Sequence, residues 1–310
     1  MDVIILAGGL SHERDVSVRS GRRVAEELRD RGLKVLVQDV DTSLIPTLRQ
    51  HPDAVVWPLL HGATGEDGSL QALLELANVK YVGTRSKEAR VAWVKPVAKA
   101  VYARDGIATP DYVTLPQSLF REVGAEQVLD VMESRFGLPL VVKPARGGSA
   151  LGVSLVHERE QLARAMVHCF AYGDNAMVER AVNGVEVAVS VIGTGDDARA
   201  LAPVEIVCDG PYDYDARYNP GRVEYFTPAR LSPQHTEAVT EAALAVHRRM
   251  GLRDLSRTDI IVDSDGVAQV LDVNIAPGLT ETSLLPQAAV AGGEDLGALY
   301  ESIVSAAAGA

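Results

Sequence analysis

Two apolar runs flank an acidic turn in the segment 256–274, which reads Ser256-Arg257-Thr258-Asp259-Ile260-Ile261-Val262-Asp263-Ser264-Asp265-Gly266-Val267-Ala268-Gln269-Val270-Leu271-Asp272-Val273-Asn274. This pattern predicts a β-hairpin. A turn that pairs Asp263 with Gly266 would place Arg257 opposite Asp272 and Asp259 opposite Val270. Because side chains alternate between the faces of a strand, one face carries the polar set Arg257, Asp259, Asp272 and Asn274. The other face carries Leu271, Val273, Ile260 and Val262 toward a core.

The polar face of this hairpin predicts a metal site. Asp259, Asp272 and Asn274 offer two carboxylates and one amide, and hard oxygen ligands suit Mg²⁺. Arg257 would complete a clamp for a phosphate or an oxyanion. For the hairpin alone, a solvated polar face with an incidental ion pair is an equal alternative. The segment that follows, 274–280, contains a Pro-Gly turn whose backbone can approach a ligand, and this favours a functional site.

A glycine-rich loop at 144–152 predicts a nucleotide-binding site in combination with the acidic hairpin, whereas the loop alone favours a plain structural turn. A strand delivers Lys143, and the small residues that follow expose backbone N–H groups, which cradle polyphosphate in many proteins. The Walker pattern is absent, so a P-loop NTPase is excluded. Lys95 is a further phosphate candidate. The segment 177–186 predicts a strand between lobes whose main chain can bind an adenine edge, with a plain structural strand as the alternative.

Alternating strands and helices in the first third of the chain predict a parallel sheet covered by helices. From Met177 onward, long strands separated by Gly and Asp turns predict a mostly antiparallel sheet. We therefore expect three lobes, at 1–92, 93–180 and 181–310. Gly8-Gly9 follows the first strand, but no G-x-G-x-x-G occurs, which disfavours a Rossmann oxidoreductase.

Composition excludes several classes of protein. The 310 residues are 47% hydrophobic and carry a net charge of -12, which disfavours binding to nucleic acid or to an anionic membrane. No apolar run approaches the roughly 20 residues that span a bilayer. Cys169 and Cys208 have no paired or metal-type spacing, and no basic leader precedes the first strand. These features predict a cytoplasmic protein.

Five strings follow one another along the chain: His12-Glu13-Arg14-Asp15-Val16-Ser17, Leu60-His61-Gly62 with Gly65-Glu66-Asp67-Gly68, the run 143–152, Tyr212-Asp213-Tyr214-Asp215-Ala216-Arg217-Tyr218, and Asp272-Val273-Asn274-Ile275-Ala276-Pro277-Gly278. In this order they resemble the ATP-grasp superfamily and, within it, the D-alanine-D-alanine ligase family. The resemblance implies an α/β and α+β fold of the ATP-grasp type. A Rossmann-like N-terminal lobe would precede a small central α+β lobe and a larger, mostly antiparallel C-terminal lobe.

The resemblance also implies the site. ATP would lie between the central and C-terminal lobes, held by Lys95, Lys143, Gly148, Ser149, Glu179, Arg180, Ala181, Val182, Glu186 and Arg217. Asp259, Asp272 and Asn274 would hold two Mg²⁺ ions, with Mn²⁺ as a substitute. The catalytic set would be Glu13, Ser149, Tyr218, Arg257 and Gly278, and the substrate-binding set Glu13, His61, Ser283 and Leu284.

In detail, Glu13 would bind the ammonium of the first D-alanine and form a triad with Ser149 and Tyr218. Arg257 and the backbone of Gly278 would stabilise an oxyanion. His61 would lie near the first substrate, and Ser283 and Leu284 near the second. The family likeness further implies a homodimer through the first lobe and a role in peptidoglycan precursor synthesis.

The chemistry implied is transfer of the γ-phosphoryl group of ATP to a carboxylate, followed by attack of an amine on the acyl phosphate. Such a reaction needs no protein nucleophile, but it does need water to be excluded. Residues 209–230 contain Tyr212, Tyr214, Tyr218 and Tyr225 and are expected to form a lid, with a plain surface loop as the alternative.

Some positions depart from the family pattern. Asp272 stands where glutamate is usual, Gly147 replaces an acidic residue, Ala150 replaces a serine, and Val94 precedes Lys95 where an acidic residue is common. Two alternatives therefore stand beside the main interpretation. One is a ligase for a different amino-acid pair, in antibiotic biosynthesis or resistance, and the other is a catalytically weak ATP-binding regulator.

Overall fold

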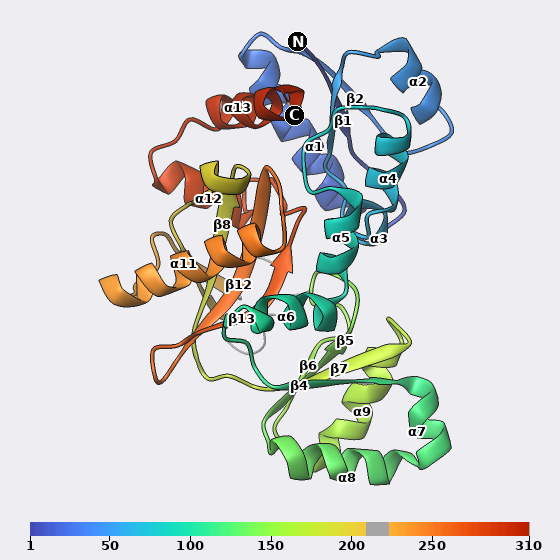
Figure 1. The fold of residues 1–310 in the computed structure, drawn as a ribbon, viewed down its shortest axis with the longest axis vertical. Coiled ribbons are helices and arrows are strands. Elements are labelled where there is room, and N and C mark those ends of the chain that lie inside the picture. The colour runs from blue at the N-terminus through green and yellow to red at the C-terminus, as the bar shows by residue number, and fades with distance from the viewer. Residues whose placement is uncertain (209–222, 310) are drawn as a thin grey trace.

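The computed structural model describes residues 1–208 and 223–309. Figure 1 shows three lobes along the long axis, with the C-terminal lobe between the N-terminal and central lobes. The predicted mixed α/β and α+β architecture is confirmed. Among the described residues, none of the helices has both the length and the apolar character needed to cross a membrane.

The N-terminal lobe contains a parallel three-stranded sheet in the order β2-β1-β3, formed by Lys34–Gln38, Asp2–Leu6 and Val55–Pro58. Val3 lies opposite Val35 on one side and Val55 on the other. The run Val3 to Leu6 is fully buried, as expected for a central parallel strand covered on both faces. The helices of this lobe are α1 (Arg14–Asp30), α2 (Leu44–Gln50), α3 (Ala63–Glu66) and α4 (Ser69–Leu76), and α5 (Ser86–Trp93) follows them with Ala89 and Ala92 buried in the core of the C-terminal lobe.

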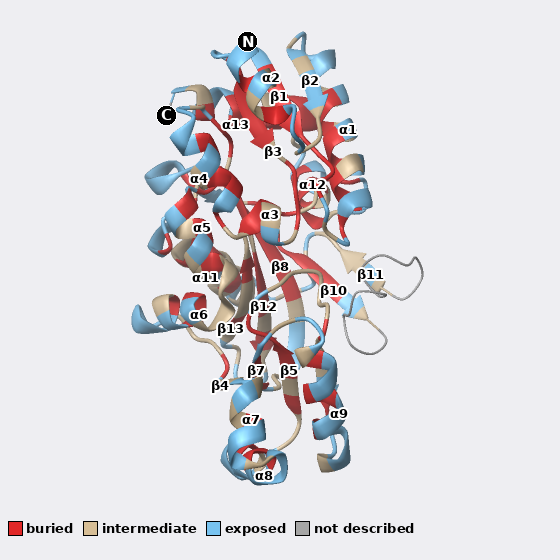
Figure 2. Ribbon diagram, turned by 90° about the vertical axis from the view of Figure 1, so that its right-hand side faces the viewer, coloured by how far each residue is buried: buried red, intermediate tan, exposed pale blue. Residues whose placement is uncertain are grey.

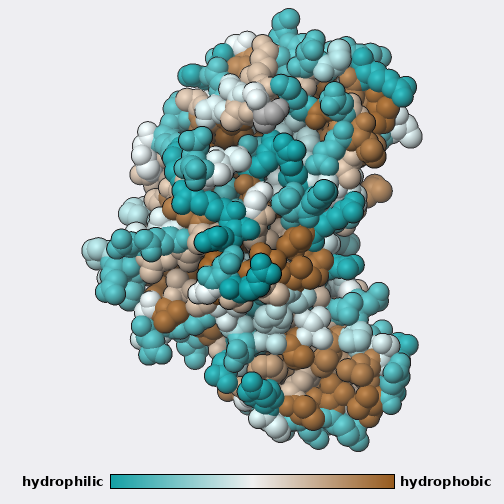
Figure 3. All heavy atoms as spheres, viewed as in Figure 1, coloured by the Kyte–Doolittle hydropathy of each residue, from teal (hydrophilic) through white to brown (hydrophobic). Residues whose placement is uncertain are grey.

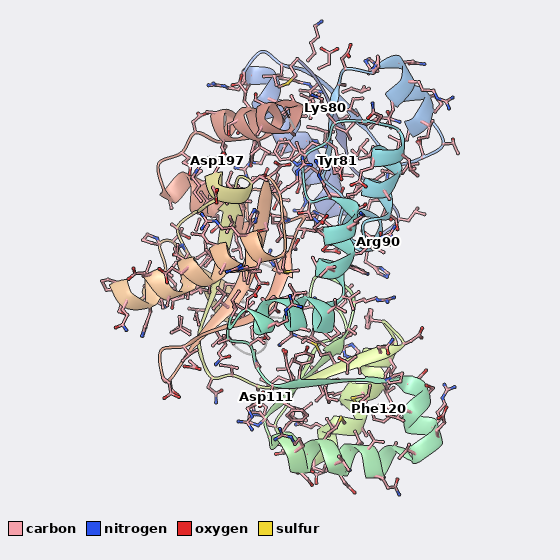
Figure 4. The ribbon with its side chains drawn as sticks, viewed as in Figure 1. Lys80, Tyr81, Arg90, Asp111, Phe120 and Asp197 are labelled. Atoms are coloured by element: carbon pink, nitrogen blue, oxygen red, sulfur yellow. The ribbon has the colours of Figure 1, made fainter. Side chains whose placement is uncertain are left out.

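The end of the chain returns to this first lobe. Helix α13 (Leu296–Gly309) places Tyr300 edge-on against Trp57, with ring centroids 5.6 Å apart. Lys80, labelled in Figure 4, donates a hydrogen bond to the carbonyl of Ala308. The N-terminal and C-terminal segments therefore share one hydrophobic core, which also includes α12 (Leu284–Ala291).

The central lobe is an antiparallel four-stranded sheet in the order β4-β7-β5-β6, formed by Tyr112–Pro116, Asn175–Arg180, Leu140–Pro144 and Ser154–Val156. Helices α7 (Gln117–Val123), α8 (Ala125–Phe136) and α9 (Arg159–Phe170) complete this lobe. Its core is separate from the others and includes Leu129, Leu140 and Val178. Figure 3 shows apolar side chains gathered on the outside of this lobe, where Leu119, Val131 and Phe136 line a groove.

The C-terminal lobe is antiparallel, as predicted. Its sheet has the order β11-β10-β8-β12-β13, formed by Val223–Phe226, Val204–Cys208, Gly184–Ile192, Leu255–Asp263 and Ala268–Asn274, with β9 (Arg199–Ala200) beside β8. Helices α11 (Pro233–Arg249) and α6 (Lys95–Arg104) pack on it, and Ala98 and Tyr102 join Val187 and Ile260 in one core. Figure 2 shows the buried strands running through the middle of the molecule.

The proposed domain boundaries stay predictions. Although α6 lies within the predicted central segment 93–180, its buried residues pack in the C-terminal core.

The hairpin forms, but its predicted register is wrong. Asp259 lies opposite Asp272, and Arg257 opposite Asn274. The Asp263 N–H donates to the carbonyl of Val267 rather than of Gly266, because the Asp263 carboxylate accepts the N–H groups of Asp265 and Val267 and widens the turn.

A bulge after Asp259 shifts the pairing again and leaves Leu271 as the extra residue. Leu271 lines a cavity instead of joining the core, contrary to the simple alternation. The two carboxylates Asp259 and Asp272 thereby become direct cross-strand neighbours.

Candidate active site

A cavity of about 320 Å³ lies between the β5–β7 side of the central sheet and the β12–β13 hairpin. It brings together most of the predicted nucleotide and metal residues. Its lining includes Lys95, Lys143, Gly148, Ser149, Glu179, Arg180, Ala181, Val182, Glu186, Arg257, Asp259, Asp272 and Asn274. These residues come from segments up to 179 positions apart, so only the folded chain can assemble them.

Lysines and a glutamate form a buried cluster at one wall of the cavity. On neighbouring strands, Glu179 lies opposite Val141, two positions from Lys143, so both charged side chains share a face. Glu179 Oε1 lies 2.6 Å from Lys143 Nζ, and Glu179 Oε2 lies 2.5 Å from the Nζ of Lys99 on α6. Burial alone would raise the pKa of Glu179, but the two ammonium groups outweigh burial and hold it below its usual value.

The opposite wall carries the hairpin carboxylates, each paired with a cation. Arg257 donates two hydrogen bonds to Asp259, at 2.7 and 2.9 Å, and Lys95 forms an ion pair with Asp272. Asn274 Oδ1 accepts the N–H of Ala276 at 2.8 Å. The cations balance the close approach of two carboxylates, which would otherwise repel each other.

These hard oxygens fit Mg²⁺, because two carboxylates and an amide lie on one face of the hairpin and line the cavity. Within residues 1–208 and 223–309, no group of three or more His, Cys, Asp or Glu side chains is arranged for a metal. A metal here would therefore depend on the Asp-Asp-Asn set and on oxygens of the bound nucleotide.

The glycine-rich loop contacts the N-terminal lobe. Ser149 Oγ donates a hydrogen bond to the Glu13 carboxylate, as the resemblance implied. Ser149 and Ala150 have φ angles of 51° and 56°, which are unfavourable for residues with a side chain. Such strain persists only where surrounding contacts hold it. Tyr218 and Arg217, the other residues expected near this loop, lie outside the described residues, as do Tyr212 and Tyr214.

Part of the expected lid is a strand. Val223–Phe226 forms β11, and Tyr225 pairs with Ile206 of β10. The sequence Val-Glu-Tyr-Phe favours a strand, since β-branched and aromatic residues are enriched there.

Glu66 is a cavity residue to which the sequence analysis assigned no role. It is buried, and its Oε1 accepts the N–H of Gly62 at 2.7 Å. A Cβ placed on Gly148 would lie 3.6 Å from Glu66 Oε1 and 3.7 Å from Glu13 Oε2, so the loop sits between two carboxylates. Burial and then the charge of Glu13 raise the pKa of Glu66 to about 8. The Gly65–Gly68 motif was the available signal, because its glycines bracket this acid.

His61 lies at a second, smaller cavity of about 20 Å³, which it shares with Gln71. Burial lowers the pKa of His61, and the nearby Glu13 charge opposes the shift. His61 Nε2 and Gln71 Oε1 are buried and have no hydrogen-bond partner among the described residues. This polar space is large enough for about one water molecule.

The predicted second-substrate residues lie at the turn after the hairpin. Ser283 is the N-cap of α12, and its Oγ accepts the N–H of Thr280 at 3.0 Å. A Cβ on Gly278 would approach this Oγ to 2.8 Å, so the turn closes tightly on the hydroxyl. The Leu284 side chain belongs to the hydrophobic core, which leaves its main chain as the part nearest the turn.

Two antiparallel sheets that enclose a cavity with paired lysines, a glycine-rich loop and a carboxylate hairpin define an ATP-grasp protein. The family model described as D-ala D-ala ligase C-terminus matches residues 101–305, and the one described as D-ala D-ala ligase N-terminus matches residues 38–84. The chain belongs to the D-alanine-D-alanine ligase family.

Relatives support this assignment across nearly the whole chain. The D-alanine-D-alanine ligase of Anaeromyxobacter sp. (strain K) is 41% identical over 99% of this chain and 96% of its own length. The crystal structure of D-alanine-D-alanine ligase from Bacillus anthracis has a TM-score of 0.83 at 26% identity, covering 99% of this chain and 97% of that one.

A second Bacillus anthracis structure of that ligase, complexed with ATP, has a TM-score of 0.81 at 25% identity, covering 99% and 96%. The VanG D-Ala:D-Ser ligase from Enterococcus faecalis has a TM-score of 0.85 at 24% identity, covering 99% of both chains, which indicates the shared fold alone.

Proposed function

We propose that the chain joins two D-alanine molecules into D-alanyl-D-alanine at the expense of ATP, for peptidoglycan precursor synthesis. The observation that carries this conclusion is the assembly of Lys95, Lys143, the glycine-rich loop and the Asp259–Asp272 pair around one cavity, with Glu13 at the loop. Family membership at 41% identity supports the same reaction.

In the first step, a carboxylate oxygen of the first D-alanine attacks the γ-phosphorus of ATP and ADP leaves. The ammonium groups of Lys95 and Lys143 offset the phosphate charge, and backbone N–H groups of the loop around Gly148 orient the phosphates. Glu13 holds the substrate ammonium. Mg²⁺ held by Asp259, Asp272 and Asn274 would neutralise further phosphate charge when bound.

In the second step, the free amine of the second D-alanine attacks the acyl carbon, and phosphate leaves. Negative charge develops on the carbonyl oxygen, where the Arg257 guanidinium and the Gly278 N–H would stabilise it. Ser283 would position the second substrate. The hydrogen bond from Ser149 to Glu13 would hold the loop over the first substrate and so limit hydrolysis of the acyl phosphate.

The proposal includes features of assembly and location. We expect a homodimer through the first lobe, domain limits near residues 92 and 180, and a cytoplasmic location, where ATP is abundant. Neither nucleic acid nor a membrane is an expected partner, because the net charge of -12 repels both. Sedimentation analysis would reveal a monomer if the dimer is wrong.

The decisive experiment measures phosphate release from Mg-ATP with single D- and L-amino acids and with pairs, including D-serine, and identifies products by mass. D-Alanine alone should yield phosphate and the dipeptide in equal amounts. Turnover with another pair of amino acids alone would show that the substrates are that pair and not D-alanine. ATP binding without any turnover would indicate an ATP-binding regulator and not an enzyme.

A further inference from the structure

Lys99 is a buried charged residue that does not line the cavity. Its side chain is 0% exposed, and it does not line the cavity wall that contains Lys143 and Glu179. Burial of a charge is unfavourable unless the charge is paired, so the position of Lys99 in the ion cluster needs a structural or functional explanation. Lys99 lies four positions after Lys95 on α6, so the two lysines share one face of the helix.

The two lysines of α6 form ion pairs with carboxylates on opposite walls of the cavity. Lys95 pairs with Asp272 of the hairpin, whereas Lys99 pairs with Glu179 of β7. Glu179 therefore has two counter-ions, Lys99 on Oε2 and Lys143 on Oε1. Of these two counter-ions, Lys143 lines the cavity and Lys99 does not, so Lys143 is the cation that can reach a ligand.

We propose that Lys99 is a positioning residue for nucleotide binding, which neutralises Glu179 so that Lys143 can leave this carboxylate and bind an anionic oxygen of ATP. Without Lys99, Lys143 would be the counter-ion that Glu179 requires. Moving it toward a phosphate would then leave a buried carboxylate uncompensated, which is strongly unfavourable. This inference rests on the proposed function, because it assumes that ATP occupies this cavity.

The surroundings of Lys99 keep it charged at neutral pH. Burial lowers its pKa to about 8, and the Glu179 carboxylate opposes that effect. The Tyr112 ring lies with its centroid 5.1 Å from Lys99 Nζ, and the negative face of an aromatic ring attracts a cation. Tyr112 is itself held by a 2.9 Å hydrogen bond from its hydroxyl to the carbonyl of Pro96, one turn away on α6.

The test compares ATP affinity of the full-length wild type with Lys99→Met, which keeps the volume and removes the charge. Calorimetry with a non-hydrolysable ATP analogue should show a Kd raised about tenfold or more. The KM for D-alanine at saturating ATP should stay within about twofold, because Lys143, through which Lys99 is proposed to act, would contact ATP and not D-alanine. Lys99→Arg keeps the charge and should restore most of the affinity.

A double-mutant cycle with Glu179→Gln separates this role from a structural one. In the Glu179→Gln background no carboxylate needs a counter-ion, so adding Lys99→Met should change Kd by less than about threefold. An equal loss in both backgrounds would overturn the proposal, as would an unchanged Kd in the single variant. Thermal denaturation monitors folding, and Lys99→Gln replaces Lys99→Met in the cycle if the latter does not fold.

The two failures are distinguishable. If the wild type does not bind the ATP analogue, the proposed function fails. If the wild type binds it and Lys99→Met binds it equally well, only the role of Lys99 is lost.

Discussion

The hydroxyl of Ser149 donates a hydrogen bond to the carboxylate of Glu13, which lies 136 positions earlier in the sequence. The contact joins the glycine-rich loop to the residue that precedes α1. Because the loop residue has a strained positive φ of 51°, the hydrogen bond helps to hold a conformation that the isolated loop would leave. In the proposed mechanism, this contact would couple nucleotide binding at the loop to amino-acid binding at Glu13.

Ser149→Ala should lower kcat by about 10- to 100-fold, because the loop would no longer be held against the first-substrate site. Steady-state kinetics with D-alanine and ATP would measure the loss. Ser154→Ala is a matched control, since Ser154 Oγ contacts His168 Nδ1 at 3.3 Å on the exposed surface. A wild-type rate for Ser149→Ala would remove the loop contact from the mechanism.

Arg257→Ala should reduce kcat by roughly 10²- to 10³-fold while changing the Kd of ATP far less, because the guanidinium is proposed to act on charge that develops in the transition state. Rapid-quench kinetics and calorimetry would separate the two quantities. Arg199→Ala removes an exposed pair with Glu294 and should leave both unchanged. Comparable losses of turnover and ATP binding would contradict the assignment.

Chelation with EDTA should abolish turnover, and added Mg²⁺ or Mn²⁺ should restore it. Asp259→Asn and Asp272→Asn should each raise the Mg²⁺ concentration for half-maximal rate by about tenfold or more, since each removes one charged ligand. Asp265→Asn, at the exposed tip of the same hairpin, is the control. Unchanged metal dependence in both variants would exclude this site as the metal centre.

Glu66 should make stability fall as pH rises. Its pKa is about 8 in the folded chain against 4.5 for the free side chain, so between these values the folded state binds more protons than the unfolded state. The free energy of unfolding therefore declines over this range, by up to a few kcal/mol for a shift of this size. The loss of stability begins above about pH 4.5 and is complete above about pH 8.

Glu66→Gln should flatten this decline, because glutamine keeps a carbonyl oxygen for the Gly62 N–H and does not ionise. Denaturant unfolding at pH 5, 6.5 and 8 would measure the difference from the wild type. Parallel curves for the two proteins would show that Glu66 titrates normally.

Several features of this chain follow from short stretches of sequence. The alternation in 255–263 and 268–274 determined the hairpin, and the small residues after Lys143 determined the glycine-rich loop. Both depend on residue types within one segment, where the two-residue period and the turn residues act locally. The order of such segments was enough to predict the three-lobed architecture and the family.

Tertiary structure alone decided how these segments meet. The turn geometry at Asp263 and the bulge at Leu271 place Asp272 opposite Asp259. The alternation of polar and apolar residues in the sequence does not predict this change of register. A buried lysine looks like any surface lysine in a sequence. Lys99 joins the buried ion cluster beside the cavity because a strand residue 80 positions away supplies its carboxylate partner, and a buried charge is tolerated only where folding brings that partner within contact.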